Sequence, residues 1–197
     1  MKLLIATNNK NKAREITEIL GPYFDDIKTQ KEAGIEIEVE EDGTTFQENA
    51  IKKAEETLKI AEGFDAVLSD DSGLMVDALG GAPGIYSARY SGEGHNDEKN
   101  KKKLLFELKD IPEEKRTARF ACSIALARRN ADTICVIDYV EGRISFEERG
   151  EKGFGYDPLF YYPPLQKTFA ELEPDVKNSL SHRHNSLMRM KEEIEKL

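Results

Sequence analysis

Hydrophobic and polar residues follow two different periods along this chain, and the two periods predict both strands and helices. Residues 2–6 are mostly apolar and predict a short buried strand. Residues 10–20 repeat apolar side chains at helical spacing and predict a helix that ends at Gly21 and Pro22. At residues 35–40 isoleucine and valine alternate with glutamate, which predicts a half-buried strand with an acidic outer face.

The rest of the chain continues to alternate between strand and helix patterns. Thr45 and Glu48 have the spacing of a capping box, so we expect a helix to begin there and to end before Gly63. Residues 129–132 separate two β-rich runs and predict a turn between antiparallel strands. The other expected elements are a buried strand over residues 66–68, a helix from Asn96 or Asp97 to about Leu108, and a last helix that runs to Leu197.

Composition and charge narrow the class of protein. The chain has 197 residues, of which 39% are hydrophobic and 34% charged, as is typical of a globular protein with a single domain, here residues 1–197. No apolar run approaches the length of a membrane span, and the N-terminal residues turn polar at Thr7, too early for a signal peptide. We therefore expect a cytoplasmic protein that does not bind membranes.

Charge and cysteine content exclude further classes. The formal net charge of −9 repels nucleic acid polymers and anionic membranes, so an anionic ligand must be small and locally bound. Cys122 and Cys135 fall in apolar runs, which predicts free thiols rather than a disulfide or a structural zinc site.

The first candidate site is a polar segment between the first strand and the first helix, made of Thr7, Asn8, Asn9, Lys10, Asn11 and Lys12. Free N–H groups at the start of a helix favour phosphate, and the two lysines add positive charge. The segment lacks the glycines and the GK[ST] ending of a P-loop. An asparagine cap followed by solvated lysines explains it equally well, so both interpretations stay open.

The second candidate site is acidic. Ser69, Asp70 and Asp71 follow the buried run 66–68, and open α/β sheets commonly bind ligands where strands end. Glu40 and Glu41 end the alternating run at residues 35–40. If the two strands are neighbours, two to four carboxylates converge and form an oxygen-rich set suited to Mg²⁺ rather than zinc. The alternatives are a local turn at Asp70 and Asp71 and an acidic surface rim, which we favour for Glu40.

Two later segments carry side chains suited to a planar base. In Gly153-Phe154-Gly155-Tyr156-Asp157-Pro158 the glycines permit close approach of the backbone, and Phe154 can stack on a ring. Ser181-His182-Arg183, with Lys177 upstream, offers donors for a carbonyl or a phosphate. A turn with a core phenylalanine and a surface His-Arg pair remain the respective alternatives.

Together these motifs resemble the inosine/xanthosine triphosphate pyrophosphatase family. The similarity runs from Thr7 to the final helix with the motifs in order, and VDALGGAPGIYSARYSG and GFGYDP are its most specific parts. The matching motifs are Thr7-x-Asn9-x-x-Lys12-x-x-Glu15, Glu41-x-Gly43-x-Thr45-Phe46 with Asn49-Ala50 and Lys53, Asp70-Asp71-Ser72-Gly73 through Tyr90-x-Gly92, Gly153 to Pro158, and Ser181-His182-Arg183.

The resemblance implies a fold and an activity. The fold is an elongated α/β structure in which a long curved mixed β-sheet with flanking helices forms two lobes around a central cleft. Enzymes of this family are cytosolic, Mg²⁺-dependent homodimers that hydrolyse ITP, dITP and XTP to the monophosphate and pyrophosphate. This activity removes deaminated purines from the nucleotide pool.

Carried over position by position, the resemblance also implies roles for individual residues. The segment Thr7 to Lys12 binds the triphosphate, Ser72 lies beside the phosphates, and Lys53 contacts a phosphate or a carboxylate. Glu41 and Asp71 bind the metal, and Asp71 also activates water. The residues assigned to the base and the nearby phosphate are Phe154, Gly155, Tyr156, Asp157, Lys177, His182 and Arg183.

The chain departs from the family pattern at three positions and leaves two other functions open. Asn8, Met75 and His184 replace residues that are usually smaller, and Asn8 could alter the phosphate loop while His184 could alter the base pocket. The other functions are a related pyrophosphatase for modified pyrimidine nucleotides and a non-catalytic nucleotide-binding regulator. How GTP would be excluded is not visible in the sequence.

Overall fold

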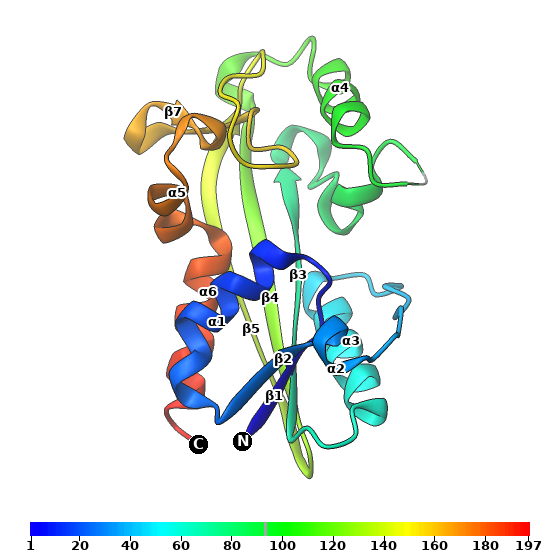
Figure 1. Ribbon diagram of the computed structural model, residues 1–197. Coiled ribbons are helices and arrows are strands. Elements are labelled where there is room, and N and C mark those ends of the chain that lie inside the picture. The colour runs from blue at the N-terminus through cyan, green and yellow to red at the C-terminus, as the bar shows by residue number, and fades with distance from the viewer. Residues whose placement is uncertain (93) are drawn as a thin grey trace. The chain divides into compact units, whose positions relative to one another are not determined.

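A mixed sheet of seven strands runs through the molecule (Figure 1). The computed structural model describes residues 1–92 and 94–197, and its strands are β1 (Lys2–Ile5), β2 (Asp26–Thr29), β3 (Ala66–Val76), β4 (Thr117–Arg128), β5 (Ala131–Ile144), β6 (Phe160–Tyr162) and β7 (Lys167–Thr168). Their order in the sheet is β2-β1-β3-β4-β5-β6-β7. β1 is parallel to β2 and β3, whereas β6 is antiparallel to β5 and β7. The predicted α/β class with a mixed sheet is confirmed.

Helices flank this sheet. The α-helices are α1 (Lys10–Leu20), α2 (Gln30–Ala33), α3 (Phe46–Ile60), α4 (Asp97–Glu107), α5 (Pro174–Leu180) and α6 (His182–Ile194). Short 3₁₀ helices lie at Gly21–Tyr23, Asp77–Leu79, Gly84–Arg89, Glu113–Lys115, Pro163–Leu165 and Phe169–Glu171. Within the described ranges, no helix has the length and apolar character that a membrane span requires.

Contacts within the chain divide it into two compact units. The first unit comprises Met1–Asp71, Cys122–Asp138 and Arg183–Leu197. The second unit comprises Ser72–Ala121 and Tyr139–His182. Along the chain, β3, β4 and β5 each begin in one unit and end in the other.

In the first unit, β1 is buried on both faces. Leu3 and Ile5 belong to an apolar core that includes side chains of α1 and α6. Leu4 belongs to a second core, which contains Ala50 and Ala54 of α3. Figure 1 shows α1 and α6 on one side of β1 and α3 on the other. A strand covered on both faces reads as a continuous apolar run because every side chain meets a helix.

In the second unit, aromatic rings and one buried arginine form the core. The ring of Phe160 lies 4.5 Å from that of Phe120 and 4.8 Å from that of Phe169. Arg116 is 1% exposed, and its guanidinium donates hydrogen bonds to four main-chain carbonyl groups. These carbonyls belong to the residues after α4 and at the end of β5, so Arg116 joins two distant segments of the chain. Its charge is solvated by peptide dipoles in place of water.

Two predicted strands differ in the structure. Residues 35–39 form no strand, although their side chains alternate between half-buried and exposed as the sequence indicates. The alternation of apolar and acidic residues indicates which side chains face the protein. A β-strand also needs a neighbouring strand for its main-chain hydrogen bonds, and among the described residues this segment has none. The strand predicted over residues 66–68 extends to Val76, so Asp70 and Asp71 lie within β3 and not after it.

The predicted helices and turn are confirmed with changes at their ends. Thr45 caps α3 as expected, and the carboxylate of Glu48 accepts the N–H of Thr44 at 2.6 Å. Asn96 caps α4, and the last helix ends at Ile194. The turn between β4 and β5 is two residues long, and Asn130 adopts a left-handed conformation there.

Both cysteines are free thiols, as the sequence predicts. Cys122 is buried in a core of the first unit, and this burial raises the pKa of its thiol to about 12. A thiol with such a pKa stays protonated at neutral pH and is a poor nucleophile.

Candidate active site

A buried group of charges surrounds Asp70 in the first unit. The carboxylate of Asp70, which is 2% exposed, lies 2.7 Å from Nζ of Lys12 and 3.4 Å from Nε of Arg183. The guanidinium of Arg183 also contacts Glu15 at 3.3 Å. Lys12 and Glu15 are three residues apart on α1 and therefore lie on the same face of that helix. We call these four side chains the Asp70 cluster.

Opposite charges decide the ionisation of Asp70. Burial alone would raise the pKa of this carboxyl group, but Lys12 and Arg183 outweigh burial and hold the pKa well below its usual range. Asp70 also raises the pKa of Arg183 against the effect of burial. Asp70 and Arg183 are therefore both ionised at neutral pH.

Asp71, the next residue on β3, has a different environment. Its carboxylate accepts a hydrogen bond of 3.1 Å from Nδ2 of Asn49 on α3. Lys53, one turn further along α3, forms an ion pair with Glu41 and donates to the main-chain carbonyl of Asp70 at 3.2 Å. The structure thus brings the two predicted metal ligands, Glu41 and Asp71, to the same end of α3.

The pKa of Asp71 is raised to about 6, first because the carboxyl group is buried and second because Glu41 is also negative. Two like charges held close together favour a bound proton or cation. Among residues 1–92 and 94–197, no three His, Cys, Asp or Glu side chains are grouped so that they could hold a metal ion. Of the two to four carboxylates expected to converge, Glu41 and Asp71 do so, whereas Asp70 is paired with Lys12 and Arg183. Glu40 is exposed, as favoured from the sequence.

The raised pKa of Asp71 predicts an unusual dependence of stability on pH. Between about pH 4 and 6 the unfolded chain releases the proton that the folded protein retains, so the free energy of unfolding falls as the pH rises. We expect metal-free Asp71→Asn to be more stable than the wild type by up to about 3 kcal/mol at pH 7.5. Below about pH 4 both proteins should have the same stability, because the carboxyl group is then protonated in both states. Urea denaturation in EDTA at several pH values measures this difference, and parallel curves for the two proteins would contradict it.

The segment Thr7 to Lys12 lies at the junction of β1 and α1, as predicted. Asn9 caps α1, and its side chain accepts the N–H groups of Asn11 and Lys12 at 3.0 and 3.2 Å. The hydroxyl of Thr7 accepts the N–H of Asn9. The interpretation as an asparagine cap is therefore confirmed for Asn9, and Lys12 is directed to Asp70. Lys10 is exposed.

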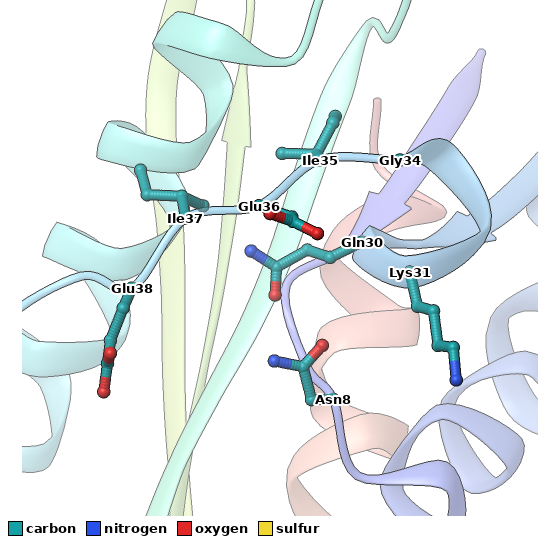
Figure 2. Close-up of a pocket in the computed structure, with 8 residues that line it drawn as sticks. All are labelled: Asn8, Gln30, Lys31, Gly34, Ile35, Glu36, Ile37 and Glu38. Carbon is teal, nitrogen blue, oxygen red and sulfur yellow. The ribbon is translucent and has the colours of Figure 1, made fainter.

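Asn8 lines a separate cavity of about 550 Å³ in the first unit (Figure 2). The other residues around this cavity are Gln30, Lys31, Gly34, Ile35, Glu36, Ile37 and Glu38. In Figure 2, Ile35 and Ile37 point to the side opposite Asn8, so the space around Asn8 is polar. Its lining has one cationic side chain against two carboxylates, which does not favour a triphosphate.

In the second unit, Phe154, Asp157 and Lys177 form one contact group. The carboxylate of Asp157 accepts the N–H of Phe154 at 2.8 Å and lies 2.5 Å from Nζ of Lys177. The same ammonium group lies 4.6 Å from the centre of the Phe154 ring. Gly153 permits this turn, because a Cβ atom there would lie 2.2 Å from Oδ2 of Asp157. The ring of Phe154 is 45% exposed, so the interpretation as a core phenylalanine is wrong.

The remaining predicted residues of this unit are held by buried contacts. The hydroxyl of Tyr156 donates to the carbonyl of Ser87 at 2.8 Å, and the N–H of Gly155 donates to Asp97 at 2.9 Å. The imidazole of His182 stacks on Phe120 at 4.9 Å and is 8% exposed. His182 and Arg183 are thus both buried, and the interpretation as a surface pair is wrong. Ser72 is half-buried in β3.

Glu15 and Asn49 received no role from the sequence, and Asp70 was considered there only as one of the carboxylates that could bind a metal. Asp70 anchors Lys12 and Arg183, Glu15 pairs with Arg183, and Asn49 binds Asp71. The spacing of Glu15 from Lys12 on a predicted helix is a signal that could have identified it. No such spacing identifies the partners of Asn49 and Asp70, because these partners are far away in the sequence.

The chain resembles known proteins over nearly its whole length. A model of the Ham1 family matches residues 3–193. The dITP/XTP pyrophosphatase of Bacillus subtilis (strain 168) is 48% identical over 98% of this chain and 96% of its own length. The dITP/XTP pyrophosphatase of Halalkalibacterium halodurans is 51% identical, with 95% of each chain covered. The structure of the Staphylococcus aureus Ham1 protein superposes with a TM-score of 0.91 at 40% identity, covering 100% of this chain and 99% of that one. The chain belongs to the Ham1 family.

Proposed function

We propose that this protein hydrolyses dITP, ITP and XTP to the nucleoside monophosphate and pyrophosphate. The observation that carries the proposal is the similarity to relatives named dITP/XTP pyrophosphatase, which are 48% and 51% identical over nearly the whole chain. Hydrolysis of a nucleoside triphosphate also fits the first unit, where Lys12 and Arg183 pair with Asp70, and the pKa of the next residue, Asp71, is raised.

The triphosphate and a metal ion are assigned to the first unit and to Ser72. The proposed phosphate contacts are Thr7, Asn8, Asn9, Lys10, Asn11, Lys12, Lys53 and Ser72. Glu41 and Asp71 would hold Mg²⁺, and the carboxylate oxygens fit this ion, which commonly binds one or two carboxylates together with substrate phosphates. Around Asp70 and Asp71, three cationic side chains face four carboxylates, which leaves one net negative charge. A divalent cation would reverse that sign and so favour a triphosphate.

Asp71 is the proposed catalytic base. Its carboxylate would accept a proton from water while the water oxygen forms a bond to the α-phosphorus and the bond to the pyrophosphate oxygen breaks. A pKa of about 6 suits this role, because the group is ionised at neutral pH and still accepts a proton readily. Bound Mg²⁺ would offset the negative charge on the phosphate oxygens. Lys12 and Lys53 would add positive charge beside the same oxygens.

The base is assigned to Phe154, Gly155, Tyr156, Asp157, Lys177, His182 and Arg183. Phe154 offers an exposed ring for stacking, and the ammonium group of Lys177 lies next to it. Hypoxanthine and xanthine present a 6-oxo acceptor, whereas adenine presents an amino donor. Adenine would leave a donor of His182, Arg183 or the loop backbone without an acceptor, at a cost of about 1–3 kcal/mol for each buried group.

A panel of nucleotides tests this function. Pyrophosphate release is measured with ITP, dITP, XTP, GTP, ATP and pyrimidine triphosphates, each with Mg²⁺ and with EDTA. We expect rapid turnover of the first three in Mg²⁺, slow turnover of the others, and none in EDTA. Equal turnover of GTP and ITP would contradict the proposed specificity. Preference for a modified pyrimidine would support the related pyrophosphatase, and binding without turnover would support a regulator.

The domain organisation, location, oligomeric state and partners of the enzyme remain predictions. We propose that both units act as one functional domain over residues 1–197, in a cytoplasmic homodimer that binds neither membranes nor nucleic acid polymers. The net charge of −9 supports the last point. Sedimentation of the purified protein tests the homodimer.

A further inference from the structure

Asn49 makes two buried hydrogen bonds that involve both ends of its amide group. The side chain is 0% exposed on α3. Its Nδ2 group donates to Oδ2 of Asp71 at 3.1 Å, and its Oδ1 atom accepts the N–H of Gly43 at 2.8 Å. A carboxylate only accepts and an N–H only donates, so the two partners fix the orientation of the amide. Burial of an amide is costly unless both ends are bonded, and both ends are.

Gly43 approaches Asn49 so closely that no other residue fits. A Cβ atom at Gly43 would lie 2.6 Å from Oδ1 of Asn49 and 2.8 Å from Cβ of Glu48. Real Cβ atoms essentially never approach other atoms to less than 3.0 Å. Gly43 does not have a positive φ, so the need for glycine comes from space and not from the backbone conformation.

This link is one of the contacts that hold the segment at residues 35–43. Residues 35–43, which include Glu41, have no regular secondary structure. Glu41 is paired with Lys53, and Asp42 is paired with Lys52 at 2.6 Å, but the carboxylate of Asp42 is 60% exposed. Exposed ion pairs contribute little. The bond from Gly43 to Asn49 lies two residues after Glu41 and continues through the amide to Asp71.

We propose that Asn49 is a positioning residue that ties the segment carrying Glu41 to Asp71 and thereby sets the spacing of the two carboxylates before a metal ion binds. The inference rests on the proposed function, which assigns Glu41 and Asp71 to Mg²⁺. A segment ordered during folding loses no further conformational freedom when its ligand binds, so preorganisation raises affinity. Groups that bond to metal ligands commonly contribute in this way.

Metal affinity, measured apart from turnover, tests the proposal. Mn²⁺ serves as the probe, and its binding to the nucleotide-free protein is followed by electron paramagnetic resonance. Asn49→Leu removes both hydrogen bonds at nearly constant side-chain volume. Gly43→Ala keeps the Asn49 amide, but the added methyl group pushes the main chain at residue 43 away from it. We expect each variant to weaken Mn²⁺ binding by about 10–100-fold. The double variant should be no weaker than the worse single variant, because both changes break the same link.

Asn100→Leu is the matched control. Asn100 is 1% exposed, accepts the N–H of Ser91 at 2.8 Å and donates to two main-chain carbonyls of the second unit. Asn100→Leu therefore also removes the hydrogen bonds of a buried amide, but one that is far from Asp71 in the sequence. Its Mn²⁺ affinity should equal that of the wild type. Circular dichroism verifies that each variant is folded, and Gly43→Ala keeps the test valid if Asn49→Leu does not fold.

Several outcomes would overturn the inference. Wild-type Mn²⁺ affinity in folded Asn49→Leu or Gly43→Ala would show that the link does not position the carboxylates. Additive losses in the double variant, or an equal loss in Asn100→Leu, would do the same. Failure of the proposed function has a different signature, in which Asp71→Asn binds Mn²⁺ as the wild type does and retains turnover.

Discussion

Asp71→Asn is expected to release pyrophosphate roughly 10²–10⁴-fold more slowly than the wild type, while nucleotide binding remains measurable. An amide has the same shape as the carboxylate, and its oxygen still accepts the hydrogen bond from Asn49. It does not take up a proton from water, and it carries no charge for Mg²⁺. Initial rates with dITP in Mg²⁺ measure the loss, and equilibrium dialysis with the same nucleotide measures binding.

A second aspartate variant separates the role of Asp71 from a general effect of lost charge. Asp65 lies just before β3, is exposed and accepts the N–H of Lys2 at 2.7 Å. Asp65→Asn should turn over dITP at the wild-type rate. Near-normal turnover in Asp71→Asn would remove Asp71 from the role of base, and an equal loss in Asp65→Asn would show that the effect is not specific.

Asp70→Asn is expected to lower the free energy of unfolding by about 3–5 kcal/mol. The amide leaves the half-buried Lys12 and the buried Arg183 without the carboxylate that now faces both. For a chain of this length the melting temperature should fall by roughly 10 °C. Because the folded pKa of Asp70 is depressed, its contribution is present above about pH 4 and is lost as the pH falls below that value. Urea denaturation of the variant and the wild type at pH 7 and pH 3 measures both effects.

An exposed ion pair is the control for Asp70. Asp26 and Lys28 lie 4.0 Å apart, and both side chains are more than 40% exposed. Asp26→Asn should change the free energy of unfolding by less than about 0.5 kcal/mol. If Asp70→Asn were equally harmless at pH 7, water or a rearranged partner would have to solvate Lys12 and Arg183, and the Asp70 cluster would not stabilise the fold.

Asp70 and Asp71, which are neighbours on β3, show how much of the site the sequence could predict. The motif Asp70-Asp71 identified an acidic position at the end of a predicted strand, and the resemblance assigned Asp71 to metal and water. The opposite pKa shifts of the two carboxyl groups come from Lys12 and Arg183 on one side and from burial with Glu41 on the other. Those partners are 30 to 113 residues away in the sequence, and no local pattern reveals such pairs.

The segment at residues 35–43 shows the limit of hydrophobic periodicity. Alternating isoleucine and glutamate correctly predicted which side chains face the protein, but the predicted strand did not form. A strand depends on a partner for its main-chain hydrogen bonds, and the partner is chosen by the whole fold. Instead, Gly43 and Asn49 hold the end of this segment through a side-chain amide.

The sequence by itself determined the helices α1, α3 and α4, the turn after β4, the free cysteines and the family, because caps, periodicity and motif order are local or additive properties. Only the tertiary structure decided that β3 continues through the two aspartates, that Arg183 is buried against Asp70, and that Asn49 links Gly43 to Asp71. These features depend on contacts between residues far apart along the chain. Burial and the charge of such distant partners, which set the ionisation of Asp70 and Asp71, arise only when the chain has folded.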